Sequence, residues 1–454
     1  MARLTRLLLA ACAVLLLPQP PAEAQRVPTR TDGLARAAAQ LRSQLLTVFT
    51  GSQGARSALG RQLEAAMRLL RRAPPVPEPP PNTTALCRQS GHNNCELHTV
   101  RTEDGYLLTA VRIPAGPGAV PVVLMHGDLA SSDSWMMRRD NSNLGTVLNE
   151  AGYDVWLGNM RGSTHARRHA TLNTTDPQFW NFSWHEMGVY DLPALVDYAL
   201  NRSGAPSAHL MAHSMSTSAS LVMLAQRPEY NAKVRLVSLM SPSIRIRSGV
   251  IRWASDITFQ FFKNNVEGYL KRNNFIEIWK RSPQLHYIGN LFCTDDSPLI
   301  GLCYRMYEQV LGQGHPDQRL PDYLATFGAY HPAGTSFRCI EHFGAINLSG
   351  RFRPLGKGIN DPNPPPDYNL TAISTPVALY YSTNDGIIDP KDVDRLAKSL
   401  PRVQDKHLVP LRQFNHVDFM WAKDARTLVY ERIIKNMKEV DASVAAGKMS
   451  NIIR

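Results

Sequence analysis

The sequence predicts an α/β fold with a mostly parallel central sheet and an inserted cap or lid domain. Short apolar stretches that are typical of buried strands alternate with helical stretches over residues 87–185, and this alternation returns at 377–381. Aromatic and basic residues and a Pro-rich end break the rhythm between these parts. We therefore expect a core in two parts, 83–245 and 367–440, a cap over 246–366, and a C-terminal tail over 441–454.

The core strands are expected in a simple order along the chain. Strands over 99–102 and 107–113 flank an Asp104-Gly105 turn, and two further strands follow. Those two cover 122–125 and 154–157, and the strand that reopens the core covers 377–381.

The chain begins with a predicted secretory signal peptide, residues 1–24. Arg3 and Arg6 precede the apolar stretch 7–17, and Ala22-Glu23-Ala24 provides a small-residue cleavage site. Because no later stretch approaches the ~20 apolar residues of a membrane-spanning helix, we expect no transmembrane anchor.

A basic helical extension, residues 25–73, follows the signal peptide, and a stiff Pro-rich linker, 74–82, joins it to the core. The chain has a net charge of +12, and residues 25–80 hold nine Arg against three acidic residues. This region is either a pro-segment or extension that packs on the body of the protein, or a helix pair that contacts anionic lipid. Arg71-Arg72 is also a candidate processing site. The basic residues have no interleaved aromatics, so nucleic-acid binding is not supported.

Cysteines and sequons agree with passage through the secretory pathway. Outside the signal peptide, the close pairs Cys87/Cys95 and Cys293/Cys303 are the natural disulfides, which leaves Cys339 free or intermolecular. Neither pair has the histidines of a zinc site, so we expect no metal. Six N-x-S/T sequons are candidate glycosylation sites: Asn82, Asn173, Asn181, Asn201, Asn347 and Asn369.

Ser214 is the candidate nucleophile. It stands between an apolar strand and a helix-like stretch, in the sequence Ala212-His213-Ser214-Met215-Ser216. A nucleophile elbow needs this strand-turn-helix context, and its usual form is G-x-S-x-G. Small residues, Ala212 and Ser216, replace both glycines.

Asp385 and His416 complete the predicted catalytic triad. Asp385 follows the strand over 377–381, and His416 comes about thirty residues later, after another short strand. His416 would take the proton from Ser214, while Asp385 would orient the imidazole. Asp389 is a competing acid that lies one helical turn further on.

Backbone N–H groups of Asp128 and Met215 are the predicted oxyanion hole. Asp128 lies in the loop after the strand over 122–125, and Met215 begins the helix after Ser214. His126 precedes this loop residue and is expected to support the loop rather than act as the base. The Asp128 carboxylate would oppose the oxyanion if it faced the acyl pocket, and would be harmless if it faced solvent.

These motifs together resemble the acid-lipase family of α/β-hydrolases, which contains gastric, lysosomal and arthropod digestive lipases. The likeness extends over residues 88–436. The segments that carry it are Glu103-Asp104-Gly105-Tyr106, His126-Gly127 with Ala130-Ser131-Ser132, Asn159-Arg161-Gly162-Ser163, Ser183-Trp184-His185-Glu186-Met187, Tyr190-Asp191-Leu192-Pro193-Ala194, Pro332-Ala333-Gly334-Thr335-Ser336, Asn384-Asp385 with Asp389-Pro390, and Asn415-His416-Val417-Asp418-Phe419.

The resemblance implies an α/β-hydrolase fold and a carboxylic ester hydrolase of lipase type that needs no cofactor. It implies a neutral lipid ester, triacylglycerol or cholesteryl ester, as substrate, with a lipid–water interface as a candidate place of action. It also implies a disulfide in the cap between Cys293 and Cys303. The expected destination is extracellular, with the lysosome as the alternative. The sequence departs from the family at the two glycines around Ser214, at Asp128, at Met215 and at Arg353-Pro354-Leu355-Gly356.

Two functions are therefore open at this point. The triad residues in the order Ser, Asp, His favour an active serine esterase. The altered residues Ala212, Ser216 and Asp128 would instead suit a catalytically weak lipid-binding or storage protein on the same fold.

Overall fold

The structure, a computed structural model, describes residues 79–138, 142–246 and 277–447. The predicted signal peptide 1–24, the extension 25–73 and most of the linker 74–82 lie outside the described residues. Part of the predicted cap and the end of the predicted tail also lie outside them. In the part of the chain that is described, no helix is long and apolar enough to cross a membrane.

The core is an eight-stranded sheet with the strand order β1-β2-β4-β3-β5-β6-β9-β10. β1 pairs antiparallel with β2, and β2 pairs antiparallel with β4, whereas every later pairing is parallel. This confirms the predicted mostly parallel sheet. The strands are β1 (Glu96–Arg101), β2 (Leu107–Ile113), β3 (Pro121–Met125), β4 (Asp154–Gly158), β5 (Ala208–His213), β6 (Val234–Met240), β9 (Val377–Tyr381) and β10 (Val403–Leu408).

Burial explains why the central strands are continuous apolar runs. Every residue of β3, β4, β5 and β9 is buried, as expected for parallel strands that are covered on both faces. β10 alternates between exposed and partly buried residues because it is the edge strand. The expected strands differ from the observed ones by three residues at most at any end.

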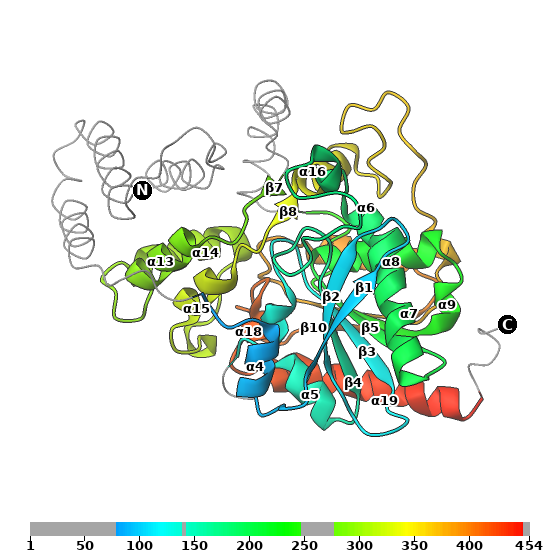
Figure 1. Cartoon of the computed structure of the whole chain (residues 1–454), viewed down its shortest axis with the longest axis horizontal. Helices are drawn as coiled ribbons and strands as arrows, with labels where there is room; N and C mark the ends of the chain where they lie inside the picture. The colour runs from blue at the N-terminus through cyan, green and yellow to red at the C-terminus, as the bar shows by residue number, and fades with distance from the viewer. Residues whose placement is uncertain (1–78, 139–141, 247–276, 448–454) are drawn as a thin grey trace.

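Helices cover both faces of the sheet (Figure 1). One face packs against α7 (Leu192–Ser203), α8 (Met215–Gln226) and α17 (Pro390–Ser399). The other face packs against α5 (Leu144–Glu150), α18 (Asp418–Trp421) and α19 (Glu431–Ala445). α19 runs past residue 440, so this helix of the core enters the segment that was expected to be a tail.

The described residues 277–376, between β6 and β9, consist mainly of helices and loops, and we call them the middle block (Figure 1). Trp421 of the core packs edge to face on Tyr323 and Phe327 of α15, so the block is in contact with the core. Its described elements are β7 (Glu277–Ile278), α13 (Pro283–Phe292), α14 (Ile300–Leu311), α15 (Tyr323–Tyr330), β8 (Thr335–Ser336) and α16 (Phe337–Ser349).

Both expected disulfides are present in the structure. Cys87 in α4 (Thr83–Gln89) is joined to Cys95 just before β1, and Cys293 at the end of α13 is joined to Cys303 in α14. Cys339 is a free thiol and is fully buried. Burial excludes the intermolecular bond that the sequence had left open for this cysteine.

The six sequon asparagines differ in exposure. Asn347 is half-buried at the end of α16, where its Oδ1 accepts the Ile246 N–H at 3.1 Å. The other five are exposed: Asn82, Asn173, Asn181, Asn201 and Asn369. We therefore expect glycans at the five exposed sites more readily than at Asn347.

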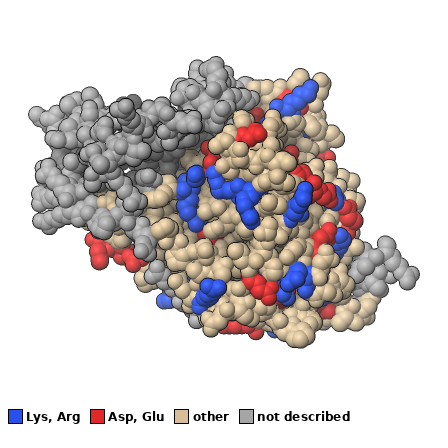
Figure 2. All heavy atoms as spheres, viewed as in Figure 1, with Lys and Arg blue, Asp and Glu red and all other residues tan. Residues whose placement is uncertain are grey.

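Charged residues on the surface are mixed. Figure 2 shows basic and acidic side chains in small separate groups on this face, with wide uncharged areas between them. The strongly basic stretch of the sequence, residues 25–80, lies almost entirely outside the described residues.

A buried arginine holds the loop after β4 in place. The Arg161 side chain is 1% exposed and pairs with the fully buried Asp191 at 2.7 Å and with Asp104 at 2.6 Å. Its guanidinium also lies over the Tyr106 ring at 3.9 Å. A charge so far from water is tolerated because two carboxylates and an aromatic face surround it.

Replacing Arg161 by Met should leave Asp191 buried without its cation. We expect Arg161→Met to lower the free energy of unfolding by about 3–5 kcal/mol, measured by urea denaturation. The matched control is Arg395→Met, which breaks the Asp392 ion pair of a side chain that is 65% exposed. The control should change stability by at most about 1 kcal/mol. Equal losses in the two variants would contradict this account.

Candidate active site

Three loops at the carboxyl ends of parallel strands bring the predicted triad together. Ser214 directly follows β5, Asp385 follows β9, and His416 follows β10. Because these strands run parallel, their carboxyl ends meet at one edge of the sheet, where ligands of open α/β sheets bind.

The three side chains form a continuous hydrogen-bonded chain. Ser214 Oγ lies 2.8 Å from His416 Nε2, and His416 Nδ1 lies 3.0 Å from each carboxylate oxygen of Asp385. The side chains of His416 and Asp385 are 5% and 2% exposed. This arrangement can deprotonate the serine hydroxyl and stabilise the imidazolium that results. The competing acid, Asp389, instead caps α17 by accepting the Lys391 N–H.

Ser214 has the strained backbone of a nucleophile elbow. Its φ of 54° and ψ of −125° lie in a region of backbone conformation that residues other than glycine seldom adopt. The oxyanion loop approaches closely, since a Cβ added to Gly127 would lie 3.0 Å from the Cβ of Ser214. A glycine at position 127 therefore lets the loop reach the nucleophile.

Ala212 and Ser216 fit the spaces that glycines usually fill. Ala212 is fully buried in β5 and pairs in register with Met125. The Ser216 hydroxyl lies 2.8 Å from the carbonyl oxygen of Met125 and 2.9 Å from that of His213, and its oxygen also accepts the His213 N–H. The hydroxyl thus links the elbow to the end of β3, and the altered motif keeps the elbow geometry.

The loop after β3 carries the predicted oxyanion residue Asp128. His126 donates from Nδ1 to the Gly127 carbonyl at 2.8 Å and accepts the Met160 N–H at Nε2, so it supports this loop as expected. Burial lowers the pKa of His126 to about 4, which keeps the ring neutral. His126 therefore does not take part in the proton transfer at Ser214.

The Asp128 carboxyl is turned back onto its own loop. Its Oδ1 accepts the Leu129 N–H at 3.0 Å, and Thr335 and Cys339 of the middle block face it. Burial raises the pKa of Asp128 to about 6. The carboxyl is therefore neutral in mildly acidic solution and carries a negative charge above that pH.

One carbonyl group of the middle block binds both the loop that carries Asp385 (the acid loop) and the loop that carries His416 (the base loop). The sequence did not suggest this contact. Leu311, the last residue of α14, accepts N–H groups of both Gly386 and His416, each at 3.0 Å. The backbones approach so closely that a Cβ on Gly386 would lie 2.6 Å from the Leu311 carbonyl carbon. The only sequence signal for this contact is the glycine that follows Asp385.

Asp418 shapes the His416 loop. Its Oδ2 accepts the Asn415 N–H at 2.7 Å, and Asn415 Oδ1 accepts the N–H groups of Val417 and Asp418. Burial raises the pKa of Asp418 to about 7. His213 supports the same loop by donating from Nε2 to the His416 carbonyl at 2.8 Å.

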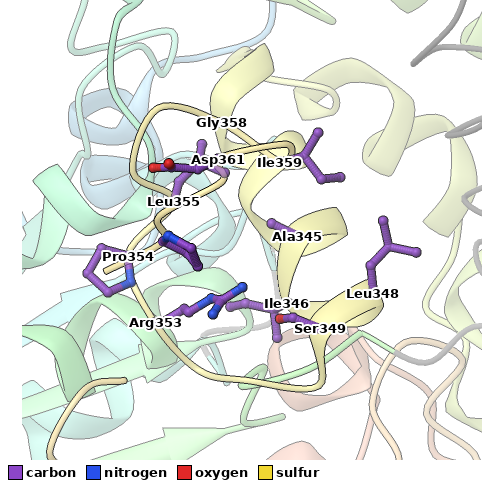
Figure 3. A pocket seen from close by; sticks show the side chains of 11 residues that line it. Ala345, Ile346, Leu348, Ser349, Arg353, Pro354, Leu355, Gly358, Ile359 and Asp361 are labelled. Atoms are coloured by element: carbon purple, nitrogen blue, oxygen red, sulfur yellow. The ribbon is translucent and has the colours of Figure 1, made fainter. Parts of the chain in front are cut away.

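A pocket lies between a helix and a loop of the middle block (Figure 3). This pocket of about 200 Å³ lies between α16 and the segment 353–364, and Leu348, Arg353 and Ile359 are among its lining residues. It contains none of the residues of the Ser214 site. Among the described residues, no group of three or more His, Cys, Asp or Glu side chains is placed to hold a metal ion.

The contact between Gly386 and Leu311 can be tested with one methyl group. Gly386→Ala should push the acid loop away from α14 and misplace Asp385, so we expect ester hydrolysis to fall about 100-fold in kcat/KM. The control is Gly116→Ala, since a Cβ at Gly116 meets nothing within 4 Å. Wild-type kinetics in Gly386→Ala would show that this close approach does not position the triad.

Two family models match the chain. A model described as the α/β hydrolase fold matches residues 120–422, and a model described as a partial α/β-hydrolase lipase region matches residues 83–139. The first match includes all three residues of the predicted triad, and the second includes the loop after β3 with Asp128.

Curated proteins from several animals are similar over most of the chain. Lipase 1 of Drosophila melanogaster is 35% identical over 352 residues, which cover 76% of this chain and 77% of that protein. Gastric triacylglycerol lipase of Bos taurus is 32% identical, covering 80% and 92%. Lysosomal acid lipase/cholesteryl ester hydrolase of Rattus norvegicus is 28% identical, also covering 80% and 92%.

Proposed function

This chain belongs to the α/β-hydrolase family of lipases, and from that membership we propose that it cleaves carboxylic esters of neutral lipids through an acyl-enzyme intermediate at Ser214. It is a carboxylic ester hydrolase, as its family and its similarity to lipases indicate. The observation that carries the assignment of the nucleophile is the 2.8 Å contact between Ser214 Oγ and His416 Nε2 in a strained elbow.

The proposed reaction has two halves. His416 takes the proton of Ser214 as Oγ attacks the ester carbonyl, and then gives that proton to the departing alcohol. A water molecule next loses a proton to His416 and attacks the acyl carbon. The bond between the acyl carbon and Ser214 Oγ then breaks, His416 returns the proton to Oγ, and the carboxylic acid leaves. Backbone N–H groups of Asp128 and Met215 would stabilise the oxyanion in both halves.

The proposed substrates are triacylglycerols or cholesteryl esters at a lipid–water interface. The support is that the bovine relative is named a triacylglycerol lipase and the rat relative a cholesteryl ester hydrolase. The middle block would cover the acyl site as a cap, because it contacts both the acid and the base loop. A secreted or lysosomal destination would suit the five exposed sequons and the two disulfides.

The alternative, a catalytically weak lipid-binding protein, loses its main support. Ala212 and Ser216 were the reasons to doubt the elbow, and both fit it without displacing Ser214. Of these three altered residues, only Asp128 is expected to affect activity, and its effect should depend on pH.

The nucleophile is tested by replacing Ser214. We expect Ser214→Ala to lower kcat for short- and long-chain esters by about 10⁴-fold or more, because no other group can form the acyl-enzyme. The matched control is Ser220→Ala, a buried serine of the same helix whose hydroxyl bonds the Ser216 carbonyl. Similar rates for wild type and Ser214→Ala would refute the assignment.

Asp128 should make both stability and activity depend on pH. Its pKa is raised in the folded protein, so its contribution to stability is present below about pH 4 and is lost as the pH rises through about 6. We expect Asp128→Asn to gain up to about 3 kcal/mol over wild type between pH 4 and 7, measured by urea denaturation. Asp418 titrates in both proteins, so its effect cancels.

Asp128→Asn should also retain more hydrolytic activity than wild type above pH 6, because the amide side chain puts no negative charge beside the oxyanion. The backbone N–H that is assigned to the oxyanion hole remains in place. Parallel pH profiles for the two proteins, in both stability and rate, would contradict a role for the Asp128 charge.

A further inference from the structure

Ser241 lies beside the acid and the base although no motif marks it. It is the first residue after β6, the strand between β5 and β9, and it is fully buried. Its N–H donates to the Tyr380 carbonyl at 2.8 Å, which ties it to the strand that carries Asp385. Its φ of 53° is uncommon for serine, as is the φ of Ser214.

The Ser241 hydroxyl contacts both partners of the nucleophile. Its Oγ donates a hydrogen bond to Asp385 Oδ2 and lies 2.8 Å from His416 Nδ1. The other carboxylate oxygen, Oδ1, accepts the N–H groups of Ile387 and Ile388 at 2.8 and 3.0 Å. Each oxygen of Asp385 therefore has at least one fixed donor besides His416.

We propose that Ser241 is a positioning residue of this active site, whose hydroxyl holds the Asp385 carboxylate and sets how tightly His416 keeps its proton during ester hydrolysis. The inference rests on the proposed roles of Ser214, Asp385 and His416. It adds a fourth side chain from a fourth strand end to the site.

Only one assignment of the hydrogen atoms on Ser214, His416 and Ser241 is consistent with these contacts. His416 Nε2 must accept from Ser214, so Nδ1 carries the hydrogen of the neutral ring. Ser241 therefore cannot donate to Nδ1, and its single proton goes to Asp385 Oδ2. Its oxygen can still accept from the Nδ1–H at 2.8 Å, so the hydroxyl bridges Asp385 and His416.

This bridge stabilises the negative charge of Asp385. Burial acts to raise the pKa of Asp385, but His416, Ser241 and the Ile388 N–H outweigh burial and the pKa is lowered. A carboxylate that is better stabilised attracts a proton on the neighbouring imidazole less strongly. Without the hydroxyl, the less stabilised carboxylate should hold the imidazolium proton more tightly, so that His416 gives it up only at higher pH. Loss of the Ser241 oxygen as an acceptor acts the other way, but its effect should be smaller because Nδ1 keeps both oxygens of Asp385 at 3.0 Å.

Among the residues that the structure describes, His213 and Asp418 also interact electrostatically with the pair. His213, at the end of β5, has its ring centroid 4.9 Å from that of His416, and burial lowers its pKa to about 3, so it stays neutral. Asp418 shares the His416 loop, and burial raises its pKa to about 7. Asp418 could add a titration of its own to the rate profile, so the experiment must separate it from Ser241.

The test compares pH profiles of kcat/KM for wild type and Ser241→Ala with a soluble ester, each corrected for active sites titrated with a phosphonate. Alanine removes the hydroxyl and keeps the Cβ at this backbone conformation. For Ser241→Ala we expect the plateau of kcat/KM to fall about tenfold and the acid limb of the profile to shift to higher pH by about one unit. The same upward shift is expected when both proteins carry Asp418→Asn.

The matched control is Ser238→Ala, a buried serine three residues earlier in β6 that pairs in register with Met211 and Ala378. It should leave the acid limb in place. Ser241→Cys keeps a weak donor and should shift the limb by an intermediate amount, and it decides the question if Ser241→Ala does not fold.

If the acid limb of Ser241→Ala lies at the same pH as that of wild type, the inference is overturned, whatever the rate of the variant. If Ser241→Ala does not fold, an unshifted acid limb in Ser241→Cys overturns the inference instead. A wild-type protein in which the phosphonate does not label Ser214 would overturn the proposed function itself. The two failures are therefore distinguishable.

Discussion

The site depends on one carbonyl oxygen, that of Leu311, which accepts N–H groups from the acid loop and the base loop together. The sheet fixes where β9 and β10 end, but Asp385 and His416 lie several residues beyond those ends. Loops of this length have many conformations, and ordering them costs entropy. A shared acceptor at the end of α14 removes much of that freedom, and it can approach so closely because residues 312 and 386 are glycines.

The same helix end belongs to the middle block, so the triad is only as rigid as the attachment of that block to the core. A buried carboxylate, Asp133, provides part of this attachment: it contacts Arg281 of the middle block and His165 of the core, each at 2.8 Å, and Thr83 at 2.5 Å. Burial acts to raise the pKa of Asp133, but His165 and Arg281 outweigh burial and the pKa is lowered. The block is therefore held by charged hydrogen bonds as well as by apolar contacts.

Much of this could be predicted from the sequence, because β5 and β9 are continuous apolar runs and the candidate functional side chains lie in the loops that follow the strands. Ser214, Asp385 and His416 were found in this way, and the structure brings them within hydrogen-bond distance. Ser241 could not be found, since a serine after an apolar strand is common and its partners lie 144 and 175 residues away. The ionisation of Asp128 likewise depends on burial by a segment about 200 residues later in the chain.

The altered elbow motif shows what the usual glycines contribute. Their requirement is one of space, because β3, β5 and the start of α8 approach closely around the nucleophile. Alanine at 212 meets that requirement, and the hydroxyl of Ser216 also bonds the last carbonyl of β3, a contact that glycine cannot make. The strained backbone of Ser214 is therefore imposed by the strand and helix on either side of it. A sequence can lose the motif and keep the elbow, provided that the replacements stay small and their polar atoms find partners.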